Sequence, residues 1–505
     1  MATNKIGRDI PDAILASSER TTFEGAGMHI PQLSAKRQSK VVDTLGQALS
    51  RSALQDGMTI SFHHAFRNGD YVLNMVLDAI AAAGIKNLTL APSSLTDAHA
   101  PLSEHIGNGV IRKIFTSGMR GKLGEAISSG ILSEPVIFHS HGGRARALES
   151  GSLQIDVAFL GVSSCDEYGN ANGCDGPSAC GALGYAICDA RHAAQVVLIT
   201  DQLVDYPNIP CSISQDRVDT IVLVDSIGDP AKISSGATRI SKNPRDLLLA
   251  EHAAHVIIHS GYFRNGFSFQ TGSGGASLAT TRFLRKEMLR RDIKMSFALG
   301  GITSAIVQLY EEGLIQRLFD VQSLDAEAIR SLREHPFHCE TDVSCYANPL
   351  NKGCVVHKLD VVVLSALEVD VNFHVNVITG ADGVIRGATG GHPDAAAGSE
   401  LAVIICPLVR GRIASVMRRV QTVVTPGECV DVVVTEYGIA VNPRRPELKK
   451  TLEQCRLPLV SIEELRRKAE SITGVAAPLE FTERIVGLIE YRDGTLLDVV
   501  RQIAD

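Results

Sequence analysis

The sequence predicts an α/β fold built on mainly parallel sheets, and three observations support this. Short apolar runs rich in β-branched residues recur along the chain, and most show no alternation of apolar and polar positions. Such runs are typical of strands that are buried on both faces of a parallel sheet. The runs are followed by turns rich in Gly, Ser or Asn, and then by stretches with helical periodicity. In folds of this kind, ligands bind in the turns at the carboxyl ends of the strands.

The individual elements follow from the same patterns. Amphipathic helices are expected where apolar residues recur at helical spacing between charged ones, at 281–291 and 460–471. The expected strands, in chain order, are 59–64, 87–92, 135–141, 156–164, 195–201, 220–226, 255–261, 295–301, 360–370, 401–407 and 431–438.

These strands are too many for one doubly wound sheet, so two domains are expected. Segment 228–246 is polar and rich in turn residues, and no strand is expected in it. We therefore place the boundary near residue 235, which gives domains 1–235 and 236–505. Both halves contain a strand followed by a glycine-rich turn, HSHGGRAR in the first and FQTGSGGAS in the second, which hints at related domains.

The composition narrows the possible classes of function. A net charge of -7 and a pI near 6.2 argue against a nucleic acid or an anionic membrane as the main partner. The first residues have no apolar core of signal-peptide length, and no run approaches the roughly 20 apolar residues of a membrane span. We therefore expect a cytoplasmic protein whose 11 cysteines are reduced thiols.

Motifs for several common chemistries are missing. The HPFHCE segment at 335–340, and His139 with His141, have no matching second pair of ligands, so no metal site is predicted. The sequence has no P-loop, which argues against ATP chemistry, and no G-x-S-x-G elbow, which argues against a serine hydrolase.

Three glycine-rich turns could carry chemistry. SHGGRAR at 140–146 could hold an anion, or it could be a plain strand-to-helix turn with surface arginines. QTGSGGA at 270–276 leads into a helix whose N–H groups could hold an oxyanion or a phosphate, although it lacks the full dinucleotide fingerprint. RGATGGHPD at 386–394 would let a bulky ligand approach the main chain closely.

Several segments resemble signatures of the acetyl-CoA hydrolase and CoA-transferase superfamily. The resemblance rests on five motifs in the order in which the superfamily has them: FLGVSSCDEYGNANG (159–173), FQTGSGGASLA (269–279), SALEVDVNFHVN (365–376), GATGGHPDAAAG (387–398) and VVTEYGIA (433–440). It implies two CoA-transferase-like domains of the NagB/RpiA type, with the active site between them.

Within this superfamily the chain is most similar to the alpha subunits of citrate lyase. The resemblance extends over nearly the whole chain through GRDIPD (7–12), SFHHAFRNGD (61–70), APSSLTDAHAPLSEHIGNGVI (91–111) and FTSGMRGKLGEAISSG (115–130). It implies the exchange of acetyl-carrier protein and citrate for citryl-carrier protein and acetate. It also implies an oligomer with a beta subunit, which would cleave the citryl thioester, and a gamma subunit, the acyl carrier protein. The CoA-derived prosthetic group would belong to that carrier, and this chain would bind no cofactor of its own.

One departure from the superfamily bears on the mechanism. Members that form a glutamyl thioester have the glutamate within G-I-H-[ST]-E-M, where this chain has GITSAI at 301–306, with Ala305 in the glutamate position. An alanine side chain cannot attack a thioester carbonyl. The resemblance therefore implies a ternary complex in which a carboxylate of citrate attacks the thioester directly. The product would be an anhydride, which the released thiolate attacks in turn.

Such a reaction requires orientation and oxyanion donors more than a protein nucleophile. By their match to the superfamily, the expected catalytic residues are Asn376, Gly390 and Gly391. Residues expected to bind the thioester through the main chain are Gly142, Gly143, Gly272, Gly274 and Gly275. Candidates for the carboxylates of citrate, each also explicable as a surface cation, are Arg120, Lys122, Arg144 and Arg146. Hydrogen-bonding roles that fix the ends of the sheet are expected for Glu368 and Glu436.

Two other interpretations stay open. A CoA-transferase or thioester hydrolase acting on free CoA would turn over acetyl-CoA alone, and most such enzymes carry a working glutamate. A scaffold or ligand-sensing module of the same fold would carry an output segment such as a helix-turn-helix, and none is visible in the sequence.

Overall fold

The computed structural model describes residues 1–18, 21–24, 39–234 and 240–504, which divide into two units, 1–39 and 40–505. In the smaller unit, β1 (Ala2–Thr3) pairs antiparallel with β2 (Asp9–Ile10), and α1 (Asp12–Ser18) follows. The amino group of Met1 makes an ion pair with the carboxylate of Asp12.

Ten strands among the described residues form the first sheet of the larger unit, in the order β28-β27-β7-β6-β5-β4-β8-β11-β13-β3. These strands are β3 (Val41–Val42), β4 (Thr59–Ser61), β5 (Leu88–Leu90), β6 (Ile111–Thr116), β7 (Val136–Phe138), β8 (Ile155–Val162), β11 (Ala193–Thr200), β13 (Thr220–Leu223), β27 (Phe481–Glu490) and β28 (Leu496–Ile503). All neighbouring strands are parallel except β27 and β28. The helices between them are α2 (Leu45–Arg51), α3 (Val72–Ala82), α4 (Leu102–Gly107), α5 (Gly121–Ser128), α6 (His141–Glu149) and α7 (Gly184–His192).

Eight strands of the described chain form the second sheet, in the order β17-β16-β15-β14-β18-β21-β25-β26. They are β14 (Phe269–Thr271), β15 (Ala298–Ile302), β16 (Leu318–Ser323), β17 (His338–Glu340), β18 (Val361–Ser365), β21 (Leu401–Ile405), β25 (Val432–Thr435) and β26 (Gly438–Val441), and only β25 and β26 are antiparallel. The helices of this half are α9 (Pro244–His259), α10 (Gly275–Arg291), α11 (Ser304–Glu311), α12 (Ala326–Glu334), α13 (Val343–Ala347), α14 (His392–Gly398), α15 (Pro446–Glu453) and α16 (Ile462–Thr473). The short helix α8 (Pro230–Ile233) belongs to the first half, where Ile233 lies against Gly69.

The two sheets share one strand order. The series β7-β6-β5-β4-β8-β11-β13 of the first sheet corresponds to β17-β16-β15-β14-β18-β21-β25 of the second. Each half also has a small three-stranded sheet after its central strand, β10-β9-β12 (Ala171–Asn172, Ser164–Asp166 and Leu203–Val204) and β20-β19-β24 (Val375–Asn376, Glu368–Asp370 and Val416–Met417). A separate hairpin pairs β22 (Val409–Arg410) with β23 (Ile413–Ala414). The relatedness of the halves is therefore visible in the strand order, although the two glycine turns that hinted at it follow non-equivalent strands, β7 and β14.

The α/β prediction with mainly parallel sheets is confirmed, and each expected strand but one overlaps an observed strand. The exception is 255–261, which lies almost entirely in α9. Asn243 caps this helix by accepting a hydrogen bond from the N–H of Arg245, and Pro244 occupies its first turn. Leu249, Ala253 and Val256 are buried at spacings of three and four residues, so the apolar run belongs to a helical pattern that begins before it.

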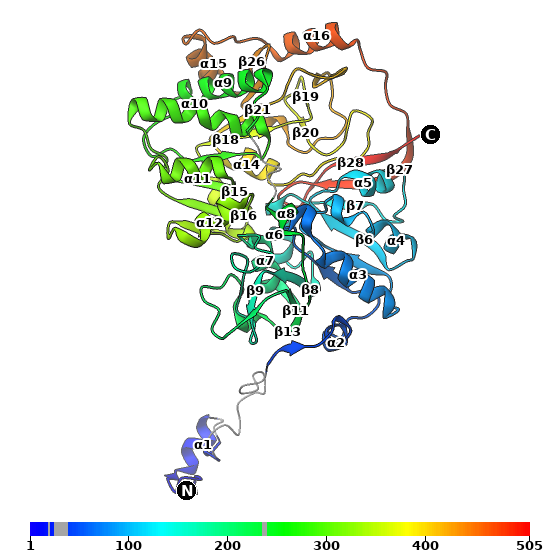
Figure 1. Cartoon of the computed structure of the whole chain (residues 1–505), viewed down its shortest axis with the longest axis vertical. Helices are drawn as coiled ribbons and strands as arrows, with labels where there is room; N and C mark the ends of the chain where they lie inside the picture. The colour runs from blue at the N-terminus through cyan, green and yellow to red at the C-terminus, as the bar shows by residue number, and fades with distance from the viewer. Residues whose placement is uncertain (19–20, 25–38, 235–239, 505) are drawn as a thin grey trace. The chain divides into compact units, whose positions relative to one another are not determined.

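The end of the chain returns to the first half of the molecule. Strand β27 pairs parallel with β7, and Figure 1 shows the last hairpin lying beside the strands of the first sheet. The expected boundary at residues 235 and 236 lies outside the described residues, and the division into 1–235 and 236–505 stays a prediction.

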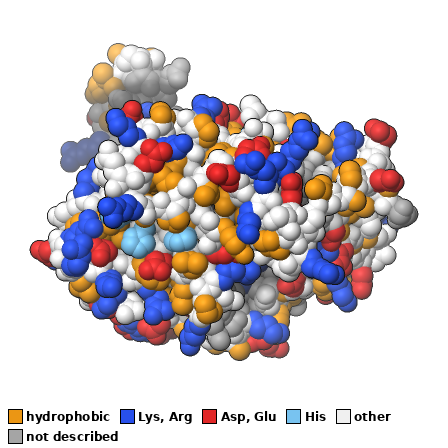
Figure 2. Space-filling model, turned by 90° about the horizontal axis from the view of Figure 1, so that it is seen from above, with side chains coloured by type: hydrophobic (Ala, Val, Ile, Leu, Met, Phe, Trp, Pro, Cys, Tyr) orange, Lys and Arg blue, Asp and Glu red, His pale blue; other side chains and the backbone are white. Residues whose placement is uncertain are grey.

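The surface carries charges of both signs. Figure 2 shows Lys and Arg side chains interspersed with Asp and Glu side chains on the face seen from above. No helix in the described ranges is both long enough and apolar enough to cross a membrane.

One ion pair is enclosed in the core of the first half. Arg144 on α6 and Asp189 on α7 have side chains only 2% and 0% exposed, and two guanidinium nitrogens donate to the carboxylate at 2.6 and 2.9 Å. The guanidinium also donates to the carbonyl oxygen of Ala91, 2.7 Å away. This bidentate geometry compensates the desolvation of both charges.

We predict that Asp189→Asn lowers the free energy of unfolding by about 3–5 kcal/mol, because it leaves the Arg144 charge buried without a counter-charge. Denaturant unfolding midpoints would measure this loss. The matched control is Glu453→Gln, which breaks an exposed pair with Lys449 at 3.9 Å and should change stability by less than about 1 kcal/mol. Equal effects of the two substitutions would contradict the prediction.

Candidate active site

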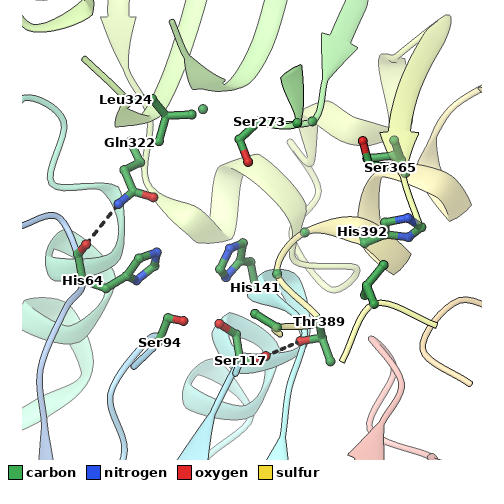
Figure 3. Close-up of a pocket in the computed structure, with 18 of the residues that line it drawn as sticks. His64, Ser94, Ser117, His141, Ser273, Gln322, Leu324, Ser365, Thr389 and His392 are labelled. Carbon is green, nitrogen blue, oxygen red and sulfur yellow. Dashed lines mark hydrogen bonds between the residues drawn. The ribbon is translucent and has the colours of Figure 1, made fainter. Parts of the chain in front are cut away.

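A cavity of about 500 Å³ lies where the carboxyl ends of strands from both sheets meet. Its size is typical of a site for a small molecule or part of a larger one. The first half lines it with turns after β4, β5, β6 and β7, and the second half with turns after β14, β15, β16 and β18. Figure 3 shows side chains from both halves directed toward this space.

The third glycine turn crosses from the second half to the strand ends of the first. The N–H of Thr389 donates to the carbonyl oxygen of Ser117 at 2.7 Å, and the N–H of His141 donates to that of Gly390 at 2.9 Å. Gly118 is required in this crossing, because a Cβ atom there would lie 2.3 Å from the Cα of Ala388. The turn is thus held as an added segment against β6 and β7.

A corresponding loop of the first half crosses to the strand ends of the second. The N–H of Ala182 donates to the hydroxyl of Ser323 at 3.1 Å, and the N–H of Leu183 donates to the carboxylate of Glu340 at 2.6 Å. The Arg67 guanidinium adds hydrogen bonds to the carbonyl oxygens of Ser323 and Leu324. Each half therefore contributes a segment that is bound to the strand ends of the other half.

Main-chain donors line the cavity on two sides. Gly272 is bound to the second sheet, because its N–H donates to the carbonyl oxygen of Val363 at 2.8 Å. The next two N–H groups, at Ser273 and Gly274, precede α10, and no acceptor for them is found within the described residues. The same holds for the N–H groups of Gly390 and Gly391 in the crossing turn.

Among the charged side chains in the described lining, cationic ones outnumber acidic ones. Arg67, Arg120 and Arg410 reach it, whereas Asp97 is the one carboxylate among the described lining residues. Arg410 also donates to the carbonyl oxygen of Ala366. Because guanidinium groups pair with carboxylates and phosphates, this composition favours an anionic ligand.

Five buried polar atoms of lining residues have no hydrogen-bond partner in the part of the chain that the structure describes. They are Nε of Arg67, the hydroxyl of Ser117, Nδ1 of His141, the side-chain oxygen of Gln270 and Nε2 of His392. Burial lowers the pKa of His141 to about 3, so its imidazole is neutral. Unsatisfied buried polar atoms are costly, and a polar ligand in the cavity would satisfy them. Within the described ranges, no group of three or more His, Cys, Asp or Glu side chains could hold a metal ion.

The structure brings some of the predicted site residues to the cavity and leaves others out. Those in the lining are Gly272, Gly274, Gly390, Gly391 and Arg120. Those outside it are Gly142, Gly143, Gly275, Lys122, Arg144, Arg146 and Asn376.

The first glycine turn is a helix start whose donors are occupied by protein groups. The N–H of Gly142 donates to Asp394, and that of Gly143 to the hydroxyl of Ser140, both at 2.9 Å. Arg144 is committed to its buried partner, and Arg146 donates to Glu490 at 2.6 Å. These contacts favour a plain strand-to-helix turn over an anion site. The expected surface arginines are wrong, however, because the Arg144 side chain is buried and that of Arg146 is nearly so.

The side chain of Asn376 makes its hydrogen bonds within its own hairpin and the turn that follows it. Its amide nitrogen donates to Glu368 at 2.8 Å and to the carbonyl oxygen of Thr379 at 2.9 Å, and its side-chain oxygen accepts from two N–H groups nearby. Glu368 and Glu436 make hydrogen bonds within the fold, as expected, the latter accepting from the N–H of Leu408 at 2.8 Å. Asn376 therefore shapes the hairpin beside the cavity.

Asp394 fixes the helix that follows the crossing turn. It is fully buried, accepts from the hydroxyl of Ser140 at 2.9 Å, and pairs with Arg492 of the last hairpin at 3.5 Å. Burial raises the pKa of Asp394 to about 6. The carboxylate thereby links α14, α6 and the end of the chain behind the cavity.

Sequence reasoning missed several lining residues, among them His64, Arg67 and Arg410. A signal existed for the first two, because they lie in SFHHAFRNGD (61–70), which continues past an expected strand and carries part of the family resemblance. No comparable signal marked Arg410, which enters the lining from a separate hairpin.

Comparisons with known proteins agree on one family. A sequence model of the family described as citrate lyase, alpha subunit, matches residues 38–503. The citrate lyase alpha chain of Klebsiella pneumoniae is 57% identical over 486 residues, which cover 96% of each chain. That of Escherichia coli (strain K12) is 56% identical and covers 97% of this chain and 96% of its own.

Solved structures give the same result. A crystal structure from Streptococcus mutans, described as the alpha subunit of citrate lyase in complex with citrate, has a TM-score of 0.92 and 54% identity, and the match covers 99% of this chain and 100% of that one. The alpha subunit of a malonate decarboxylase from Acinetobacter baumannii shares the fold, with a TM-score of 0.64 at 16% identity over 87% of this chain and 85% of that one. The CoA-transferase-like fold class is confirmed, and the chain belongs to the citrate lyase alpha-subunit family.

Proposed function

We propose that this chain transfers the acyl-carrier thioester from acetate to citrate, so that acetyl-carrier protein and citrate become citryl-carrier protein and acetate. The observation that carries the proposal is the composition of the cavity between the halves. Main-chain donors face it from two glycine turns, three arginines face it from different elements, and Asp97 is the lone carboxylate in its described lining.

The two reactants would meet in this cavity as a ternary complex. A carboxylate oxygen of citrate attacks the thioester carbonyl carbon, a C–O bond forms, and the carbonyl electrons move to oxygen. The oxyanion then collapses, the C–S bond breaks, and the thiolate leaves with its electron pair. The thiolate next attacks the citryl carbonyl of the mixed anhydride, and acetate leaves. Charge balances at every step, and no proton is transferred.

Protein groups would orient the reactants and stabilise the oxyanion. The N–H groups at 273–274 and 390–391 have no acceptor within the described part of the chain, and such preorganised donors can lower the barrier of acyl transfer by several kcal/mol. Ala305, at the start of α11, stands where related enzymes have their nucleophilic glutamate and cannot accept an acyl group.

Citrate would be held by the arginines of the lining. Its three carboxylates call for several cations, and Arg67, Arg120 and Arg410 approach the cavity from different sides. The hydroxyl of Ser117, which has no partner among the described residues, and the side chain of Gln270 add neutral hydrogen-bonding groups for a polar substrate.

The partners would be the beta and gamma subunits of citrate lyase in an oligomeric complex. The CoA-derived prosthetic group would be supplied by the gamma subunit, the acyl carrier, whose arm would carry the thioester into the cavity. This chain would bind no further cofactor.

The defining experiment mixes the purified chain with acetylated carrier protein and radiolabelled citrate in the absence of the beta subunit. We expect labelled citryl-carrier protein, with one acetate released for each citryl group formed. Acetate release without labelled carrier would instead indicate a thioester hydrolase. Equal turnover of acetyl-CoA in place of the carrier would indicate an enzyme of free CoA thioesters.

A second prediction concerns citrate recognition. Arg120→Gln should raise the KM for citrate about tenfold or more, because it removes a charge-assisted hydrogen bond, and should change the KM for the acetyl-carrier less. The control is Arg112→Gln, since Arg112 lies on β6 outside the lining and pairs with Glu134 at 3.4 Å. An unchanged KM for citrate in Arg120→Gln would remove this residue from the citrate site.

A further inference from the structure

His64 lines the cavity and has no role in the reaction described so far. Its ring packs against the rings of His141 and Tyr185, with centroids 5.7 and 4.6 Å away. Its carbonyl oxygen accepts a hydrogen bond from Gln322 of the second half at 3.1 Å. Figure 3 shows the His64 and His141 rings close together at the cavity. The imidazole is thus fixed at the junction of the halves.

Ser93 determines which ring nitrogen of His64 carries the proton. The Ser93 hydroxyl is fully buried, accepts from the main-chain N–H of His64 at 3.1 Å, and lies 2.6 Å from His64 Nδ1. No other acceptor for this hydroxyl hydrogen is found among the described residues. A buried hydroxyl without an acceptor is costly, so Ser93 donates to Nδ1 and the ring proton lies on Nε2.

The Nε2–H group is then available to a ligand. No protein group in the described ranges makes a hydrogen bond to Nε2, and His64 lines the cavity. Burial is the main reason why the pKa of His64 lies well below its ordinary value, and the neighbouring His141, His63 and Arg67 add to this effect. The ring therefore remains neutral near physiological pH.

We propose that His64 is a further catalytic residue, whose Nε2–H donates a hydrogen bond to the oxygen that becomes negative when the citrate carboxylate attacks the thioester, and that Ser93 is its positioning residue. This role rests on the proposed acyl transfer. Because that transfer moves no proton, the reaction calls for a donor that does not ionise, and a neutral imidazole of fixed tautomer has this property. A charged imidazolium would instead bind the ground-state carboxylate of citrate.

The proposal is tested with His64→Met, which lacks a donor, and His64→Gln, which keeps an N–H near the position of Nε2. In the labelled-citrate assay, His64→Met should lower kcat about 100-fold to 1000-fold with little change in either KM. His64→Gln should retain most of the activity. The control His252→Gln changes a histidine of α9 that contacts the carbonyl oxygen of Thr435 at 3.1 Å, outside the cavity, and should not alter kcat.

A second measurement reads the tautomer directly and does not require turnover. In protein labelled with 15N-histidine, the His64 signals, identified by their loss in His64→Gln, should show a protonated Nε2 and an unprotonated Nδ1 between about pH 6 and 8. Ser93→Ala should shift these signals toward a mixture of tautomers and lower kcat more than it raises either KM. This result decides the assignment even if His64→Met does not fold.

The proposal is overturned if His64→Gln and His64→Met lose equal activity, if His64→Met keeps normal kcat, or if Nδ1 carries the proton. Failure of the proposed function looks different, because the wild-type chain would then form no labelled citryl-carrier protein while the tautomer of His64 could still be read.

Discussion

The main-chain hydrogen bonds between residues 387–391 and the strand ends of the first sheet determine where the cavity lies. A glycine turn of one half becomes part of the wall built on the other, and the loop that contains Ala182 and Leu183 makes the reverse crossing. Gly118 permits the close approach of the two main chains, where a side chain would collide with Ala388. Since neither half forms the lining alone, the reactants can be held from two sides only while both crossings are in place.

Charged groups behind the cavity support this geometry and leave the lining free for a ligand. Arg144 and Asp189 satisfy each other in the core, and Asp394 joins α14 to α6 and to Arg492. Of the arginines that reach the cavity, Arg67 and Arg410 donate to carbonyl oxygens and so retain positive charge for an anion. The buried ion pairs therefore stabilise the fold. The cations that contact only carbonyl groups can bind an anionic ligand.

Much of the fold was predictable from the sequence, because buried parallel strands appear as unbroken apolar runs. The run at 255–261 misled because a helix buried on most sides has the same local composition, and the cap at Asn243 that decides the matter lies before it. For the site, the turns at 272–274 and 390–391 were predictable from their glycines. The fate of Arg144 was not, because the partner that neutralises it lies 45 residues further along the chain. Whether a cation is exposed or paired depends on the tertiary structure. The need for glycine in a turn can instead be predicted from the neighbouring sequence.

The central claim is that both reactants must be present in this cavity together, with no acyl group resting on the protein. The most direct test is a single-turnover experiment in which the chain is mixed with acetyl-carrier protein alone, and citrate is added only after a delay. A ternary complex predicts no acetate before citrate is added and stoichiometric acetate afterwards. A burst of one acetate per chain before citrate is added would contradict it, and would direct attention to Asp97, the carboxylate in the described lining, as the group that had taken the acyl-carrier thiol.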